Sequence, residues 1–481
     1  MKNLNNYLLE AAGKAKDKIS AENPYREIAF DGNNPRLGWV KPVSFNKIKF
    51  LFESIFSLIS KKENFIFIGM GGSINGIKPL LALFKQPNFF SLDNLDPKAI
   101  DNILSQIKNP EKTLVVAISK SGTTPETQLL SQALKSYFID KLGSSRWYEK
   151  FLWLTDPESF EKLNRLGWTD VKKITIQSNQ CSDIGGRFSS PLTNIFLLPL
   201  FLLLNKNFTK LEQLYFQFIS NRDEIRKSAY QVALSLNEDC DFNFSPTIEV
   251  EWVKSFTPWI AQLFQESLGS KNSEKSVKTI VNFSGPGFIK LKADFNFSEP
   301  VLSIMAQMYF YQLFIAYLSG KWGINFVNQE FVEKYKKKMR ALEEKENIST
   351  DILEGDISDL VERIGKKIKN EHRFIELVFY FMPDTAVTSL IQKEIEKRFD
   401  QKIILSFVGS DWNHQCYQAA FGDKNTFYVL ICLSSYDHTD FVSESLADRN
   451  IKTLRRIALA THQTLLDKSI LYNFNKESLG G

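Results

Sequence analysis

The sequence predicts an α/β protein that folds into two doubly wound, mainly parallel sheet domains with flanking helices. Short apolar runs, each followed by a turn and a longer helical pattern, recur along both halves of the chain. Strands that alternate with helices indicate a parallel sheet covered on both faces. A single hydrophobic core stops growing well below 481 residues, so the length indicates at least two domains.

The first half supplies four predicted strands, each a short apolar run at the start of a strand–turn–helix unit. They are residues 64–69, 113–119, 150–156 and 172–177. Helical patterns follow from Ile74 and Pro125. We expect residues 1–215 to form the first αβα domain.

The second half repeats this pattern, and we expect residues 216–481 to form a second αβα domain that includes the C-terminal strands and helices. Its predicted strands are residues 247–252, 278–283, 374–381, 402–407 and 426–433. A long helical stretch is expected over residues 300–345. A helical connector over residues 208–242 is expected to separate the two sheets.

Composition argues against several classes of protein. The net charge of +5 is spread over 60 basic and 55 acidic residues, without the clustered basic face typical of nucleic-acid binding. The most apolar run, residues 195–204, is about half the ~20 residues of a membrane span, so we expect a buried core helix and no membrane partner. The four dispersed cysteines form no CxxC pair, and the N-terminus has no apolar signal core. We therefore expect a cytoplasmic protein with no metal site and no cofactor.

Two polar loops follow the first two predicted strands. The loop at residues 69–73, GMGGS, lets backbone approach a ligand and adds a hydroxyl at a helix N-terminus. The loop at residues 119–124, SKSGTT, carries four hydroxyl side chains, which suit a bound oxyanion. It lacks the GxxxxGK[ST] spacing of nucleoside triphosphate loops, which favours a sugar phosphate. The alternative is that its hydroxyls only cap the following helix.

A third cluster, GGRFSS, places two glycines directly before Arg187. The glycines let the backbone turn so that the guanidinium can point into a cleft, where its permanent charge can stabilise an oxyanion. Ser189 or Ser190 could equally cap a helix that begins near Pro191.

A fourth cluster, PWIAQLFQES, reads as a helix with a buried apolar face after Pro258. Gln262 and Glu266 are four residues apart, so they share one side of this helix. A carboxylate among apolar residues is suited to act as a base near neutrality. The alternative is a solvated glutamate at the helix end before Gly269.

One of the four histidines, His414, comes just after a predicted strand among polar neighbours. A histidine in this position is well placed for proton transfer. Lys336 lies on a strongly charged helical segment, where it resembles its many neighbouring lysines.

Together, GMGGS, SKSGTTPET, IGGRFSS and AQLFQES resemble the phosphoglucose isomerase family in sequence, order and approximate separation. The segment GINFVNQEFVEKYK is similar to the family's C-terminal signature, in which a glutamine precedes a catalytic lysine by seven positions; here these are Gln329 and Lys336. The resemblance covers most of the chain from about residue 60. It implies a fold of the sugar-isomerase type and reversible interconversion of glucose 6-phosphate and fructose 6-phosphate through ring opening and a cis-enediolate.

The resemblance implies a role for each matching residue. Glu266 would move the proton between C2 and C1, and Arg187 would stabilise the enediolate. His414 and Lys336 would assist ring opening. The residues that would hold the substrate are Gly72, Ser73, Ser119, Lys120, Ser121, Thr124, Gln262 and Gln329.

The order of these residues departs from the common form of the family, in which the histidine lies between the glutamate and the lysine. Here His414 follows Lys336, an order that resembles the subgroup fused to transaldolase. The family is usually a homodimer whose histidine reaches into the neighbouring subunit's site, so the resemblance implies a homodimer. Two alternatives stay open: a non-catalytic sugar-phosphate-binding regulator, and an isomerase that uses mannose 6-phosphate.

Overall fold

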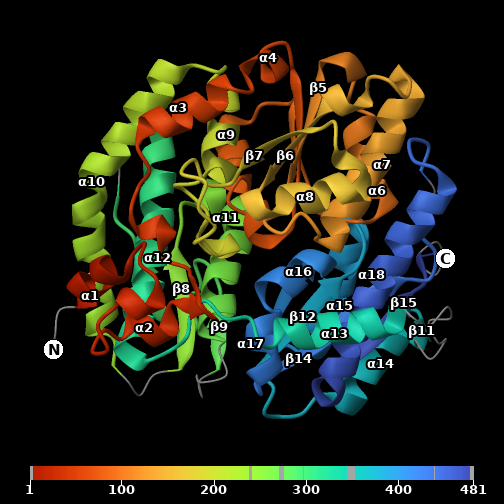
Figure 1. The fold of residues 1–481 in the computed structure, drawn as a ribbon. Coiled ribbons are helices and arrows are strands. Elements are labelled where there is room, and N and C mark those ends of the chain that lie inside the picture. Colours follow the sequence, from red (N-terminus) through yellow and green to blue (C-terminus); the bar gives the residue numbers. More distant parts are fainter. Residues whose placement is uncertain are drawn as a thin grey trace.

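The computed structural model describes residues 4–237, 241–269, 276–295, 297–343, 353–437 and 439–476. Within them lie two five-stranded sheets, one above the other in Figure 1, and a smaller third sheet beside long helices. Both large sheets are wholly parallel, which confirms the predicted fold class.

The first sheet has the strand order β4-β3-β5-β6-β7. Its strands are β3 (Asn64–Ile68), β4 (Phe89–Leu92), β5 (Thr113–Ile118), β6 (Phe151–Thr155) and β7 (Lys172–Thr175). The four strands predicted for the first half are confirmed. The edge strand β4 escaped prediction because it is only four residues long and most of its side chains are half-buried.

Helices cover both faces of the first sheet, as a doubly wound fold requires. They are α5 (Lys78–Phe84), α6 (Pro97–Leu104), α7 (Pro125–Leu142), α8 (Phe160–Leu163) and α9 (Asn194–Leu203). Helices α5 and α9 share a core with Phe67 and Val116, whereas α6 and α7 share a core with Ile68 and Ala117 on the opposite face. The predicted core helix at residues 195–204 is confirmed as α9, which is buried along its whole length although Pro199 lies inside it.

The second sheet has the order β11-β15-β14-β12-β13. Its strands are β11 (Leu353–Gly355), β12 (Phe374–Phe379), β13 (Ile403–Val408), β14 (Thr426–Leu433) and β15 (Ser469–Phe474). Its helices are α14 (Ile357–Lys367), α15 (Thr385–Arg398), α16 (Gly409–Gln415), α17 (Tyr417–Gly422) and α18 (Glu444–Thr464). The predicted strands at residues 374–381, 402–407 and 426–433 are confirmed.

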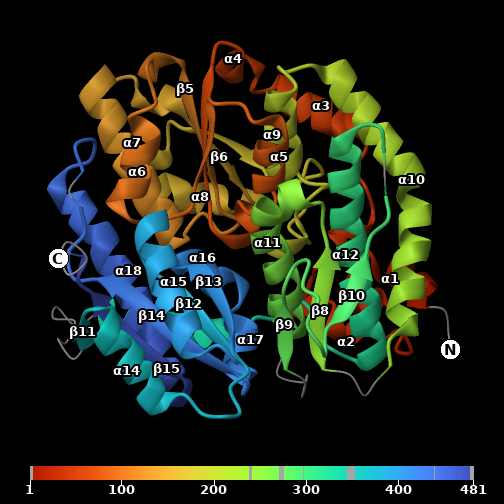
Figure 2. The ribbon, with the colours of Figure 1, turned by 180° about the vertical axis from the view of Figure 1, so that it is seen from behind.

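The part of the chain that follows the first large sheet and precedes the second forms long helices and the small parallel sheet β10-β8-β9, which lie beside the two large sheets (Figure 2). Its elements are α10 (Phe208–Ser235), β8 (Phe242–Thr247), α11 (Val253–Ala261), β9 (Val277–Thr279), β10 (Ile289–Lys292) and α12 (Pro300–Trp322). Residue 215, the predicted end of the first domain, lies inside α10, and this boundary stays a prediction. Helix α12 is long and apolar enough to cross a membrane, but its apolar window is fully buried, so it is a core helix.

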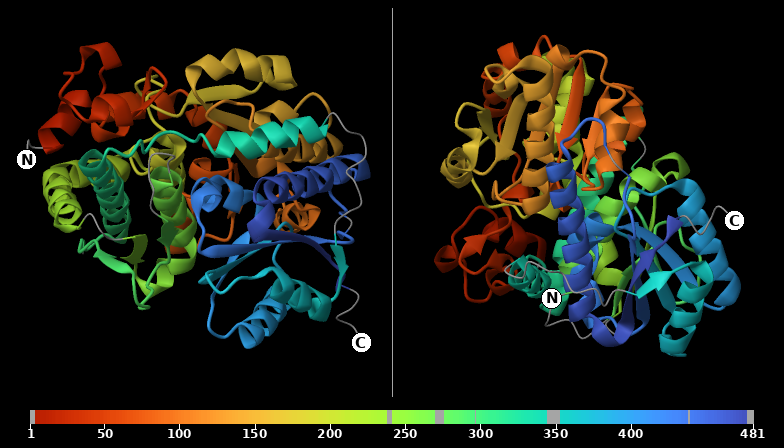
Figure 3. Two further views of the ribbon diagram at one scale, coloured as in Figure 1. Left: turned by 90° about the horizontal axis from the view of Figure 1, so that it is seen from below. Right: turned by 90° about the vertical axis from the view of Figure 1, so that its right-hand side faces the viewer.

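The N-terminal segment is made of short elements. They are α1 (Leu4–Ala11), α2 (Tyr25–Ile28), β1 (Phe30–Asp31), β2 (Asn34–Pro35), α3 (Phe45–Glu53) and α4 (Phe56–Ile59). Helix α1 and the large central helix α12 are in contact, so the start of the chain packs onto the core. The views in Figure 3 show this segment, in red, on the side of the molecule away from the second sheet.

Three predicted elements are wrong in their extent. The strand expected at residues 247–252 ends at Thr247, because the chain then turns outward: Val250 is exposed and the Trp252 amide closes a 3-10 turn on Glu249. The strand expected at residues 278–283 is only β9, since Asn282 takes a left-handed conformation (φ 55°). The helix expected over residues 300–345 is interrupted at Gly323 (φ 68°) and resumes as α13 (Val332–Glu343), beside α18 (Figure 3).

Candidate active site

The two polar loops meet at the carboxyl ends of β3 and β5, which are hydrogen-bonded neighbours in the first sheet. The first loop contains the 3-10 turn Gly71–Ser73, and the second leads into α7 at Pro125. Gly71 and Gly122 both have a left-handed backbone (φ 52° and 67°), which a residue with a side chain rarely adopts. The glycines at these two positions therefore set the path of both loops.

The second loop arranges its hydroxyl groups among themselves. The side-chain oxygens of Ser119 and Thr124 lie 2.9 Å apart. Ser121 Oγ accepts hydrogen bonds from the amide (3.2 Å) and the hydroxyl (3.0 Å) of Thr123. Ser119 is buried beneath the loop, whereas Ser121 is exposed toward the cavity.

The side chain of Lys120 leaves this loop and reaches the segment that precedes Arg187. Its ammonium donates to the carbonyl oxygen of Ile184 at 2.9 Å and lies 3.8 Å from the carboxylate of Asp156. Burial, and then the nearby charge of Arg36, lowers the pKa of Lys120. Lys120 thus connects the SKSGTT loop to the GGR segment.

The GMGGS loop packs directly on the GGR segment through two glycines. A Cβ atom on Gly72 would lie 2.2 Å from the carbonyl carbon of Gly186 and 2.5 Å from the amide nitrogen of Arg187. These neighbours are backbone atoms, which cannot move aside as a flexible side chain could. Gly72 is therefore required for the close approach that brings Arg187 beside the first loop.

Replacing Gly72 with alanine should destabilise the protein by about 1–3 kcal/mol, because the added methyl group overpacks this contact. Urea unfolding checks this value. Gly186→Ala is the matched control, since its added Cβ would meet only the Gly72 Cα, at an ordinary 3.9 Å. Equal stability of the two variants would show that the glycine contact does not hold the loops together.

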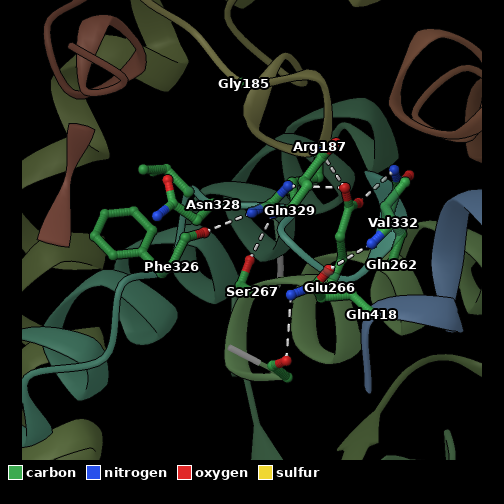
Figure 4. A network of polar contacts seen from close by, with 12 residues as sticks. Gly185, Arg187, Gln262, Glu266, Ser267, Phe326, Asn328, Gln329, Val332 and Gln418 are labelled. Atoms are coloured by element: carbon green, nitrogen blue, oxygen red, sulfur yellow. Dashed lines mark hydrogen bonds and ion pairs between the residues drawn. The ribbon is translucent and has the colours of Figure 1, made fainter. Parts of the chain in front are cut away.

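Arg187 and Glu266 form a buried ion pair at the floor of the site (Figure 4). Arg187 Nη1 lies 2.9 Å from Glu266 Oε1, and the two side chains are 1% and 5% exposed. The guanidinium also donates to Ser267 Oγ (2.8 Å) and to the carbonyl oxygen of Phe326 (2.6 Å). The alternative expectation of a solvated glutamate at a helix end is therefore wrong.

Two glutamines complete the surroundings of the Glu266 carboxylate. Gln262 Nε2 donates to Glu266 Oε2 at 2.8 Å, as their shared helix side predicts, and Gln329 Nε2 donates to Oε1. The segment Gln262–Glu266 forms a π-helical turn, a feature that often occurs at functional sites. Oε1 thus has two donors and Oε2 has one, which leaves a lone pair of Oε2 open.

His414 reaches the same region from α16, which lies below the first sheet in Figure 1. Its Nε2 is 3.0 Å from Glu126 Oε1, and Glu126 belongs to the first turn of α7. Burial raises the pKa of Glu126, but His414 and further groups more than offset this, so its pKa lies below the usual value. In this arrangement His414 and the two polar loops belong to the same chain.

Lys336 lies on α13 and lines the same cavity as His414. Its ammonium is 3.1 Å from Glu333 Oε1, and its side chain is about one third exposed (31%). It is thus more accessible than the Arg187–Glu266 pair.

These groups surround a cavity of about 660 Å³. The predicted site residues that line it are Gly72, Ser73, Lys120, Ser121, Thr124, Gln262, Glu266, Gln329, Lys336 and His414. Arg187 lines an adjoining cavity of about 560 Å³, and Ser119 lines neither. The structure therefore brings together the two loops, the carboxylate and the histidine, of which Ser73 and His414 are more than 300 residues apart in the chain.

The main cavity is also lined by charged residues that are not among the predicted site residues. They include Arg36, Glu126, Lys162 and Arg340. Glu126 lies within SKSGTTPET, so the motif itself pointed to it. The other three are ordinary basic residues in charged segments, and no local pattern distinguishes them.

A family model described as phosphoglucose isomerase matches residues 44–215, the segment that holds both loops and Arg187. Residues 44–215 are therefore similar to the phosphoglucose isomerase family, and we call them the phosphoglucose isomerase segment. The remaining predicted residues lie outside the matched segment: Gln262, Glu266, Gln329, Lys336 and His414.

Curated relatives match part of the chain. The glucose-6-phosphate isomerase of Campylobacter jejuni subsp. jejuni is 31% identical over 240 residues, which are 47% of this chain and 56% of that protein. An enzyme of the same name from Thermus thermophilus is 35% identical over 140 residues, 29% of this chain and 32% of that protein. The chain thus spans about half or less of the length of these curated relatives.

Solved structures resemble the fold beyond the phosphoglucose isomerase segment. A hypothetical protein of Thermus thermophilus matches with a TM-score of 0.51 and 19% identity, over 70% of this chain and 94% of that one. A glucose-6-phosphate isomerase of Chlamydia trachomatis matches with a TM-score of 0.50 and 17% identity, over 70% and 82%. At these identities the likeness concerns the fold alone.

A partly buried charged cluster joins the histidine helix to the phosphoglucose isomerase segment. Lys78 of α5 lies between Asp93 (2.5 Å) and Asp411 (3.1 Å), and Asp411 belongs to α16. Burial lowers the pKa of Lys78, but the two carboxylates together raise it above its usual value. Asn75 Nδ2 connects Asp411 (3.3 Å) with Gln262 (3.4 Å), so the supports of His414 and Glu266 are joined.

Proposed function

We propose that this chain catalyses the reversible isomerisation of glucose 6-phosphate and fructose 6-phosphate. The observation that carries the proposal is the position of the Glu266 carboxylate. It is buried, paired with Arg187, and lines a cavity that also contains the hydroxyl groups of the two loops. A protein that only bound a sugar phosphate would need the loops but would have no use for this carboxylate and guanidinium. The names of the relatives agree with the proposal.

In the proposed reaction, Glu266 removes the proton from C2 of the open-chain aldose. The electron pair forms the C1–C2 double bond, and the aldehyde oxygen becomes an enediolate oxyanion. Arg187 stabilises this developing negative charge. Glu266 returns the proton to C1, the hydroxyl proton on O2 moves to O1, and the ketose results. Oε2 is the better candidate for the proton-carrying atom because it has only one donor in the structure.

The phosphate group would lie between the two loops. Ser73, Ser121 and Thr124 would donate hydroxyl hydrogen bonds, with backbone of Gly72 and Lys120 beside them. Ser119 would act mainly through its contact with Thr124. Gln262 and Gln329 would position both the sugar and the Glu266 carboxylate.

Ring opening would use His414 and Lys336, which both line the cavity. His414 would give a proton to the ring oxygen as the bond between C1 and that oxygen breaks. The proton of the anomeric hydroxyl would pass to solvent beside Lys336 as the C1 aldehyde forms. Glu126 would orient the imidazole, which fits the 3.0 Å contact.

His414→Ala should slow turnover of the cyclic sugar by about 10²-fold or more, because general acid–base catalysis typically contributes that much. An open-chain analogue should be converted with a much smaller loss, since it needs no ring opening. Steady-state rates with the two substrates measure the difference. Glu126→Gln should reproduce the same selectivity in weaker form; equal losses with both substrates would remove His414 from ring opening.

The substrate range is tested by a coupled assay with fructose 6-phosphate and mannose 6-phosphate side by side. We expect conversion of fructose 6-phosphate to glucose 6-phosphate at the higher rate. Preference for mannose 6-phosphate would support that alternative isomerase. Binding of both without conversion would support the non-catalytic regulator.

We also propose three further features, of which the first two rest on the family resemblance and the third rests on the composition. The order Glu266, Lys336, His414 supports a place in the subgroup that is fused to transaldolase. We further propose a homodimer in solution, which sedimentation tests, and a cytoplasmic location. In a homodimer the His414 of each chain would serve its own cavity, as its contact with Glu126 favours.

A further inference from the structure

A second polar cavity, of about 560 Å³, lies at the amino ends of the strands of the first sheet, whereas the candidate active site lies at their carboxyl ends. Its lining residues come from α4 and from the turns just before β3, β5 and β6 (α4 is at the top of Figure 1). They are Ser57, Leu58, Lys61, Lys62, Glu111, Lys112, Arg146, Glu149 and Lys150. The six residues of β5 separate the two ends of the strands by about 20 Å. We call this cavity the lysine pocket.

Positive charge predominates in the lysine pocket. Its lining has five basic side chains and two acidic ones. Arg146 and Lys150 share the Glu111 carboxylate, at 2.9 and 2.6 Å. Lys112 pairs with Glu63, at 2.6 Å.

Two of the lysines are buried at the base of the pocket. Lys62 is 8% exposed and Lys150 is 2% exposed. Both ammonium groups donate to the same carbonyl oxygen, that of Glu111, at 3.1 Å each. In the described part of the chain, no carboxylate lies within 4 Å of the Lys62 ammonium, whereas Lys150 has Glu111.

The surroundings of Lys62 make its charge costly. Burial, and then the neighbouring charge of Lys150, lowers the pKa of Lys62 to about 8, although Glu111 and Glu149 raise it in part. A bound anion would compensate this surplus charge. Two ammonium groups on one carbonyl oxygen repel each other, and Glu111 is an ion-pair partner of Lys150 but not of Lys62.

We propose that the lysine pocket binds a small molecule through a phosphate group. Lys62 and Lys150 would face the phosphate from the base of the pocket. Arg146, at the rim, offers the planar pair of N–H donors that suits two phosphate oxygens. A cavity of this volume has room for a phosphate monoester and is concave, as small-molecule sites are.

Equilibrium dialysis with radiolabelled inorganic phosphate at pH 7 tests the proposal. The background protein carries Ser121→Ala and Thr124→Ala, which remove hydroxyl donors from the catalytic cavity. We expect this protein to bind one phosphate per chain. Adding Lys62→Met should weaken that binding at least tenfold, whereas Lys61→Met, with the same loss of charge, should change it less than threefold.

The pH and a rim variant provide independent readouts. The affinity should fall as the pH rises above about 8, where Lys62 loses its proton, and Lys62→Met should abolish this dependence. Arg146→Gln alters a side chain that is 53% exposed, so it should fold and should weaken binding several-fold. No phosphate bound by the background protein, or unchanged binding in both Lys62→Met and Arg146→Gln, would overturn the proposal. Neither outcome depends on isomerase activity, so a failure of this proposal can be told apart from a failure of the proposed function.

Discussion

Glu266→Gln should lower the turnover of fructose 6-phosphate by about 10²- to 10⁴-fold, the range that a positioned general base contributes. Glutamine has nearly the same shape but cannot take up the proton from carbon. The two polar loops are unchanged in the variant, so the affinity for the sugar phosphate should stay within a few-fold. A coupled assay measures turnover, and calorimetric titration measures binding.

Glu158→Gln is the matched control for this prediction. Glu158 also lines the main cavity, but it lies outside the Arg187–Glu266 network. Turnover should change little in that variant. If Glu266→Gln were as active as Glu158→Gln, Glu266 would not be the base.

Arg187→Met should produce the largest loss of stability, about 3–5 kcal/mol, because it leaves the buried Glu266 carboxylate without its cation. The variant also loses the donors to Ser267 and to the carbonyl oxygen of Phe326. Urea unfolding measures the free energy of unfolding. Turnover should fall as well, since no charge would then stabilise the enediolate.

A double variant separates the ion pair from simple packing. Arg187→Met with Glu266→Gln removes both charges, so it should be more stable than Arg187→Met alone. If the destabilisations of the two single variants simply added, the two side chains would not be energetically coupled in solution.

Much of the fold was predictable because its strands are local, apolar and regularly followed by helices. The strands before the two loops, at residues 64–68 and 113–118, are buried almost throughout and have a clear signal. The edge strand β4 and the break between α12 and α13 had weaker signals. The break depends on a single residue, Gly323, within a long apolar and charged helical pattern.

The site was predictable where its chemistry lies in short motifs. The spacing of Gln262 and Glu266 correctly predicted that they share one side, and their hydrogen bond realises it. Contacts between distant segments were not predictable in this way. The fit of Gly72 against Gly186 and the pairing of His414 with Glu126 arise only when separate strands and helices are packed together.

The most direct test follows fructose 6-phosphate by NMR in D₂O with the purified chain. The proposed proton transfer predicts that glucose 6-phosphate appears and that deuterium from the solvent enters C2 of the product. Both signals should vanish with Glu266→Gln, while the sugar phosphate still binds. Binding of fructose 6-phosphate by the unaltered chain with no glucose 6-phosphate formed would contradict the account.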